Sequence, residues 1–232
     1  MSVASLLVLG LVFGLKHALD ADHVAAVASI ASERRSILGS SLVGAWWGLG
    51  HTVALLGAGV VVILFRVQIS DRVATGLELC VAWMLIFLGA STLWTLARLR
   101  QVHLHVHRHG ERVHIHPHAH AHPHGRAVEE DRHHGIPGQT RPFLVGVVHG
   151  FAGSAALMLL VASTIPSPAL GFVYIGAFGI GSIGGMVAMS AVVSLPAVLT
   201  ARRYNRANLA LRAAAGAFSL CLGVMLAVQL TL

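Results

Sequence analysis

Charged residues are scarce in this chain. Of its 232 residues, 11% are Asp, Glu, Lys or Arg and 56% are hydrophobic, whereas about 25% of a typical soluble domain is charged. A chain of this composition cannot cover its apolar residues with a water-compatible surface. We therefore expect a protein that is embedded in the lipid bilayer.

Cysteine and clustered basic charge are also lacking. Cys80 and Cys221 lie in separate apolar segments without CxxC spacing, which excludes a disulfide framework and a zinc ribbon. The sequence pI is about 11, but the basic residues are confined to short connections between apolar blocks, so we expect no nucleic-acid partner. No basic segment precedes the first apolar run, and no cleavage site ends it, so we expect a retained transmembrane helix.

Apolar blocks account for most of the chain. A hydrocarbon core is about 30 Å thick and requires about 20 helical residues. Helices satisfy their backbone hydrogen bonds within one segment, which favours an all-α polytopic integral membrane protein. Six blocks are long enough to be transmembrane helices: 3–31, 40–65, 77–97, 142–164, 170–199 and 210–231.

The two halves of the chain resemble each other. GLKH at 14–17 recurs as GVVH at 146–149, GLGH at 48–51 aligns with GIGS at 179–182, and FLGAS at 87–91 aligns with CLGVM at 221–225. An odd number of spans in each half inverts the second copy, which predicts a 3+3 inverted repeat. The domains are then 1–97 and 142–232, two three-helix membrane repeats of which the first carries HALDADH, joined by a histidine-rich loop at 98–141.

The distribution of arginine predicts the orientation. Only Arg66 and Arg72 occupy connections on one side of the membrane. The positive-inside rule therefore places both termini outside and the loop at 98–141 in the cytoplasm, in a cell (inner) membrane. The connections on the other side carry Arg34, Arg35, Arg98, Arg100, Arg108, Arg112, Arg126, Arg132, Arg141, Arg202, Arg203, Arg206 and Arg212.

HALDADH places four ionisable side chains inside the first apolar block. His17, Asp20, Asp22 and His23 lie within seven residues, and ionisable groups at bilayer depth are costly and usually functional. Imidazole binds nickel and cobalt, and two carboxylates offset the charge of one divalent ion. We interpret the motif as a metal site, in preference to a set of interhelical hydrogen bonds.

Helical geometry leaves the role of Asp22 open. At about 100° per residue, His17, Asp20 and His23 share one side of a regular helix and Asp22 points to the other. Either Asp22 orients a ligand from outside the coordination shell, or the helix is distorted at the motif. We add His51 and His149 as metal residues because they are the other histidines inside apolar blocks, each three residues after a glycine.

These residues resemble a known family. HALDADH matches the HxxxxDH signature of the nickel/cobalt transporter family, and GLKHALDADHVAAVAS at 14–29 is similar to its short urease-accessory or NicO-type permeases. LGHT at 49–52 and VHGFAGSAAL at 148–157 resemble two further family motifs. The resemblance implies transport of Ni²⁺, with Co²⁺ as a second substrate, and an essential HALDADH motif. Longer uptake members have eight predicted helices, whereas efflux members have about six and a histidine-rich loop.

The connection between the halves is rich in histidine. Twelve histidines lie between His103 and His134, many at alternate positions, a composition typical of disordered, metal-binding sequence. We predict that this loop is largely disordered and buffers divalent metal. Its candidate ligands are His103, His105, His107, His109, His114, His116, His118, His120, His122 and His124.

The sequence thus favours a nickel permease that is not an enzyme, has no cofactor, and has divalent ions and the bilayer as partners, together with cytoplasmic nickel-handling proteins. Uptake is preferred and efflux is the alternative. Two other classes stay open: a membrane acyltransferase, because His17 and Asp22 satisfy an HxxxxD spacing, and a membrane-anchored metal store or sensor based on the loop.

Overall fold

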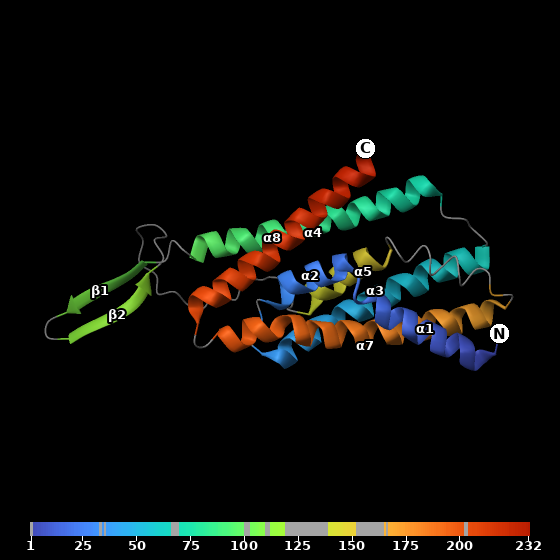
Figure 1. Cartoon of the computed structure of the whole chain (residues 1–232), viewed down its shortest axis with the longest axis horizontal. Helices are drawn as coiled ribbons and strands as arrows, with labels where there is room; N and C mark the ends of the chain where they lie inside the picture. The colour runs from blue at the N-terminus through green and yellow to red at the C-terminus, as the bar shows by residue number, and fades with distance from the viewer. Residues whose placement is uncertain are drawn as a thin grey trace.

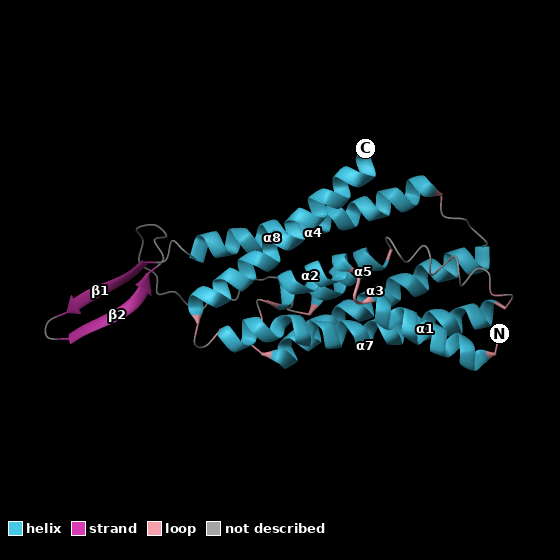
Figure 2. Cartoon of the chain, in the orientation of Figure 1, coloured by secondary structure: helices cyan, strands magenta, loops and turns pink. Residues whose placement is uncertain are grey.

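The computed structural model describes residues 2–32, 34, 36–65, 70–99, 103–109, 112–118, 139–151, 165, 167–201 and 204–232. Its helices within these ranges are α1 (Val3–His17), α2 (Ala21–Ala31), α3 (Ile37–Phe65), α4 (Asp71–Leu99), α5 (Thr140–Gly150), α7 (Pro168–Thr200) and α8 (Asn205–Thr231) (Figure 1). The described membrane part is entirely helical, as the continuous apolar blocks predict (Figure 2).

Four of these helices, α3, α4, α7 and α8, are long and apolar enough to cross a membrane. The number becomes five if α1 and α2, which are bent by 59° at a short break, form one span. Six spans are therefore not reached within the described residues. The predicted block at 142–164 is described only as α5, because residues 152–164 lie outside the described part of the chain.

The helices form two groups with α2 between them. Helices α4 and α8 pack against each other, and α3 and α1 both pack on α7, while α5 packs on α3 (Figure 1). Helix α2 contacts helices of both groups. Eight of its eleven residues are buried, so the short helix that follows HALDADH lies at the centre of the bundle.

Glycines allow the helices of the group formed by α1, α3, α5 and α7 to approach closely. A Cβ atom at Gly14 of α1 would collide with the carbonyl oxygen of Phe178 on α7. A Cβ atom at Gly146 of α5 would collide in the same way with the carbonyl oxygen of Trp47 on α3. These positions are the first residues of GLKH and GVVH, so each motif packs its helix directly against the backbone of a neighbour.

Part of the histidine-rich connection forms a β-hairpin. Strands β1 (His103–His109) and β2 (Arg112–His118) are antiparallel, with His103 opposite His118, His105 opposite His116 and His107 opposite His114. The composition predicts disorder here, but histidine at alternate positions also has the two-residue period of a strand. The hairpin projects beyond the bundle, at the end where α4 ends and α8 begins (Figure 1).

Candidate metal centre

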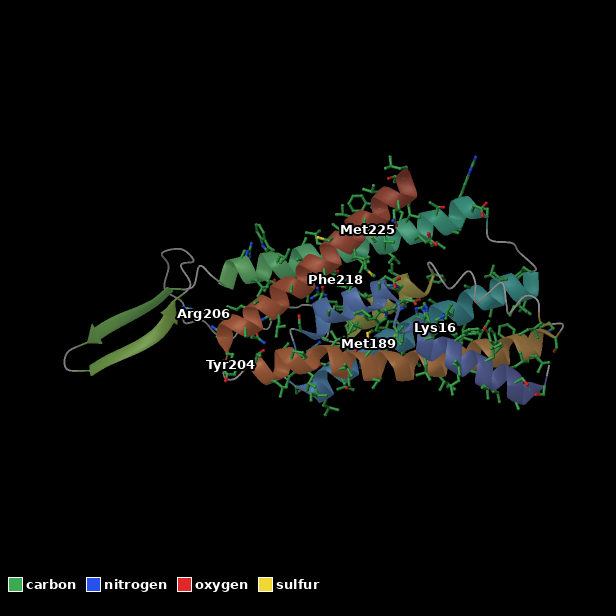
Figure 3. All side chains as sticks on the ribbon, viewed as in Figure 1. Lys16, Met189, Tyr204, Arg206, Phe218 and Met225 are labelled. Carbon is green, nitrogen blue, oxygen red and sulfur yellow. The ribbon has the colours of Figure 1, made fainter. Side chains whose placement is uncertain are left out.

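The HALDADH motif lies at the break between α1 and α2. Helix α1 ends at His17, and the amides of Leu19 and Asp20 close the last turn by donating to the carbonyls of Lys16 and His17 at 3.0 Å. Asp20 then adopts an extended conformation and is the N-cap of α2, a position that Asp favours. Figure 3 places Lys16, the residue before His17, at mid-length of the bundle.

This break supplies the distortion that one of the two alternatives for Asp22 requires. The helix is distorted at the motif, so the angles of a regular helix do not apply. His17 at the end of α1 and Asp22 and His23 in the first turn of α2 all reach the same cluster. The acidic side chain of Asp22 also lies at the positive end of the α2 dipole, where a negative charge is stabilised.

Two histidines meet across α1 and α3. The Nε2 atoms of His17 and His51 are 3.2 Å apart. Nitrogens that each lie about 2.1 Å from a metal ion are themselves about 3.0 to 3.4 Å apart when they subtend 90° to 109° at the ion. The observed spacing fits two ligands of one ion, and both side chains are buried, with His17 6% and His51 0% exposed.

Asp22 joins two further histidines. Its Oδ1 atom is 3.0 Å from His23 Nδ1, and its Oδ2 atom is 2.8 Å from His149 Nε2 on α5. A carboxylate only accepts, so each imidazole donates an N–H to it. The other nitrogen of each ring, His23 Nε2 and His149 Nδ1, is buried without a hydrogen-bond partner.

Asp20 acts on His17 from the edge of the cluster. Its Oδ2 atom accepts from His17 Nδ1 at 2.8 Å, which leaves His17 Nε2 with its lone pair directed at His51. The Asp20 side chain is 44% exposed, whereas His23 is fully buried. A carboxylate that fixes the tautomer of a ligating histidine is the usual arrangement around protein-bound metals.

Aromatic side chains enclose the imidazoles. The Trp47 ring stacks on His23 at 5.8 Å between centroids and lies 5.5 Å from His149, while Phe178 lies 5.4 Å from His17. Trp47 was not among the residues predicted from the sequence, although it lies four residues before His51 on α3 and therefore on the same side of that helix. These walls are apolar and offer the unpartnered nitrogens no hydrogen-bond partner.

The structure thus brings together all six metal residues predicted from the sequence. They come from α1, the break, α2, α3 and α5, which no single stretch of sequence unites. Buried imidazoles with unpaired nitrogens next to carboxylates are chemically suited to a divalent transition metal. Of the predicted loop ligands, seven lie in β1 and β2, and His120, His122 and His124 fall outside the described residues.

Comparison with known proteins agrees with this chemistry. The family of NicO, high-affinity nickel-transport protein, matches residues 3–232. The chain belongs to the NicO family. It is also 35% identical to a urease accessory protein, UreH, from Bacillus sp. (strain TB-90), over 209 residues that cover 88% of this chain and 82% of that protein. No solved structure matches the chain significantly.

Membership of the NicO family confirms the resemblance inferred from HALDADH and makes the chain a metal-ion transporter, not an enzyme. With its long apolar helices, the chain is a multi-pass membrane protein. The acyltransferase alternative is disfavoured, and the geometry agrees: the oxygens of Asp22 face His23 and His149, while His17 Nδ1 faces Asp20.

Proposed function

We propose that this NicO protein carries Ni²⁺, with Co²⁺ as a second substrate, across the cell (inner) membrane through the buried histidine cluster. The observation that carries the proposal is the set of buried ring nitrogens without a hydrogen-bond partner, on His23, His51 and His149, in a family of nickel transporters. Such a nitrogen can ligate an ion directly, as at His23, or take up the hydrogen that an ion displaces from the other nitrogen of the ring, as at His51 and His149. The carboxylates of Asp20 and Asp22 offset its two charges, which lowers the cost of holding a dication away from water.

Each of the six residues has a part in this proposal. His17, His23 and His51 offer one set of ligand atoms for the ion, and Asp22, His23 and His149 offer a second. Asp20 orients His17 and, because its side chain is 44% exposed, is the first carboxylate that a hydrated ion meets. A charged group at bilayer depth requires water or protein contacts, so the exposed side of Asp20 marks the access to the site.

We further propose that the two halves form a 3+3 inverted repeat that provides alternating access. Two glycines that occupy equivalent positions in the two halves, Gly89 and Gly223, support the repeat, because their neighbours also occupy equivalent positions. A Cβ atom at Gly89 would lie 2.5 Å from the carbonyl oxygen of Gly216, and one at Gly223 would lie 2.7 Å from that of Ala82. Residues 82 and 89 on α4 are each 134 positions before residues 216 and 223 on α8. Adding 134 to the α4 position and subtracting it from the α8 position therefore turns the contact of Gly89 with Gly216 into the contact of Gly223 with Ala82.

Uptake is the proposed direction and efflux the alternative. The relative is named as a urease accessory protein, and a nickel enzyme in the cytoplasm requires nickel to enter the cell and to be passed on by nickel-handling proteins. The proposed orientation has both termini outside and the loop at 98–141 in the cytoplasm. In agreement with this orientation, both termini lie away from the end of the bundle that carries the hairpin (Figure 1).

The connection between the halves is proposed to buffer metal at the cytoplasmic face. Three of the seven residue pairs in the β1–β2 register match histidine with histidine. Imidazole binds divalent transition metals, and a sequence rich in histidine collects them with little selectivity. The buffer is separate from the transport site, so its loss should leave transport intact.

Purified protein in proteoliposomes tests the function. Radioactive nickel flux is measured in each direction for the natural chain, His17→Ala and Asp22→Ala, with His105→Ala in the hairpin as the matched histidine control. We expect both cluster variants to lose flux while the control retains it. Equal flux in the natural chain and both cluster variants would refute transport through this centre. Accumulation only in the outward direction would replace uptake by efflux.

A further inference from the structure

The histidine cluster divides into two groups of ligands. Among the described residues, two sets of three have ligand atoms within 4.8 Å of one another: His17 with His23 and His51, and Asp22 with His23 and His149. His23 is the only residue common to both. We propose that these sets are two overlapping positions for one ion, which passes from one to the other while His23 remains bound. The inference rests on the proposed transport of nickel.

Ring contacts join His23 to the other histidines of both sets. Its centroid is 4.4 Å from that of His17 and 4.1 Å from that of His149. The rings of His17 and His51 are 5.0 Å apart, and the ring of His51 is 5.5 Å from that of His23. His23 therefore contacts rings of both sets, so an ion in either set can bind it.

Each position contains a polar contact that an ion can replace. In the first, the Nε2 atoms of His17 and His51 share one hydrogen across 3.2 Å. In the second, His149 Nε2 donates its hydrogen to Asp22 Oδ2 across 2.8 Å. An ion that binds His51 Nε2 or His149 Nε2 displaces the hydrogen from that nitrogen. The hydrogen then moves to Nδ1 of the same ring, which can accept it because His51 Nδ1 and His149 Nδ1 are both unpartnered. Protons balance, because each imidazole stays neutral and changes only its tautomer.

The two positions differ in chemistry, which suits a transfer. The first offers three imidazole nitrogens, and the second replaces one of them by the carboxylate of Asp22. Conduction requires binding that is strong enough for the ion to enter and divided among sites so that it can leave. A shared His23 means that the ion always keeps one protein ligand, so the transfer avoids a bare dication inside the bundle.

Binding and flux respond differently in this arrangement. The positions exclude each other because they share His23, so their association constants add. Loss of one of two equal positions then lowers the apparent affinity only about twofold, whereas loss of both removes binding. Flux requires both positions in series, so loss of either one should lower it at least about tenfold. A single centre that uses all the ligands at once predicts instead that the losses of affinity multiply.

Trp47 provides a local readout of the ion. Its ring lies 5.8 Å from that of His23 and 5.5 Å from that of His149, so nickel bound at either position should quench its fluorescence. The twelve histidines of the loop also bind nickel, which makes total binding uninformative. Subtracting the signal of Trp47→Phe removes the contributions of the other tryptophans and of the loop.

The test uses the full chain with His51→Gln, His149→Gln and the double variant, titrated with NiCl₂ and assayed for nickel flux in proteoliposomes. Glutamine keeps a hydrogen-bond donor and removes the imidazole. Ser190→Ala, which alters another fully buried side chain, is the control and should match the natural chain. A parallel series with alanine, checked by size-exclusion chromatography, replaces any glutamine variant that misfolds.

We expect each single variant to bind nickel about twofold more weakly with at least tenfold lower flux, and the double variant to bind at least thirtyfold more weakly, far beyond the product of the single losses. A double loss equal to that product, or natural flux in the His149 variant, would overturn the two positions. Absence of nickel flux in the natural chain, with the binding pattern intact, would instead refute the proposed function.

Discussion

The spacing between α3 and α5 should control transport, and Gly150→Ala tests it. A Cβ atom at Gly150 would lie 2.5 Å from the carbonyl oxygen of His51 and 2.8 Å from the Cβ of Ala54. Ordinary contact begins at 3.4 Å, and contacts under 3.0 Å are essentially never seen. The two helices must therefore separate locally by about 0.5 to 0.9 Å.

This displacement falls directly on the metal centre. Gly150 follows His149, whose Nε2 atom is 2.8 Å from Asp22 Oδ2. A shift of the same size along this contact lengthens it to about 3.3 to 3.7 Å, beyond the range of an N–H···O hydrogen bond. Functional sites tolerate displacements of about 0.5 Å, and 1 Å can cost about a hundredfold in rate. We expect nickel flux to fall about 10- to 100-fold and the free energy of unfolding to fall by about 1 to 3 kcal/mol.

The assay is nickel flux in proteoliposomes together with thermal denaturation of the purified protein. Gly184→Ala is the matched control, because a Cβ atom at this position of α7 meets nothing within 4 Å. Alanine is also a better helix former than glycine by up to about 1 kcal/mol. The control should therefore be as stable as the natural chain or more so, with unchanged flux. Flux in Gly150→Ala within about twofold of the control would refute the argument from helix spacing.

Three further outcomes are expected. Asp20→Asn weakens the 2.8 Å contact between Asp20 Oδ2 and His17 Nδ1 that orients His17. It should lower nickel affinity, measured by quenching of Trp47 fluorescence, about 10- to 100-fold. Deletion of residues 103–134 should leave nickel flux within about threefold of the natural chain and change the nickel sensitivity of the cells. Gly89→Ala and Gly223→Ala introduce contacts of 2.5 and 2.7 Å at the α4–α8 interface, so they should lower the melting temperature by similar amounts while nickel binding is retained.

Matched variants make these outcomes decisive. Asp71→Asn removes an exposed carboxylate in the first turn of α4 and should leave affinity unchanged; an equal loss in Asp20→Asn and Asp71→Asn would exclude an orienting role. Gly76→Ala adds a Cβ atom that meets nothing within 4 Å and should not lower the melting temperature. Complete loss of flux in an inserted loop deletion would contradict a buffering role, and strongly unequal effects at Gly89 and Gly223 would contradict the repeat.

Local sequence was sufficient for the residue types of the centre and for most of the helices. Four ionisable side chains in an apolar block indicate function because their burial is costly without a ligand. The glycine motifs that precede His17 and His149 also indicated close helix packing, and the structure places both glycines against a neighbouring backbone. Helix ends were less well predicted: α4 begins at Asp71, six residues before the apolar block from which it was inferred.

The role of Asp22 could not be read from the sequence, because it depends on where the first helix ends. The sequence contains neither proline nor glycine between His17 and His23, the usual causes of a break. Only the folded chain shows that Asp20 begins a new helix bent by 59° from the first. This bend turns Asp22 toward His149 and His23.

The sequence by itself determined that the chain is a helical membrane protein with histidine and aspartate in its first apolar block, because composition and hydropathy are local properties. Tertiary structure alone decided that His51 from α3 and His149 from α5 reach that block, and that Trp47 encloses His23. Coordination depends on the distances between side chains of different helices. Those distances exist only after the helices have packed.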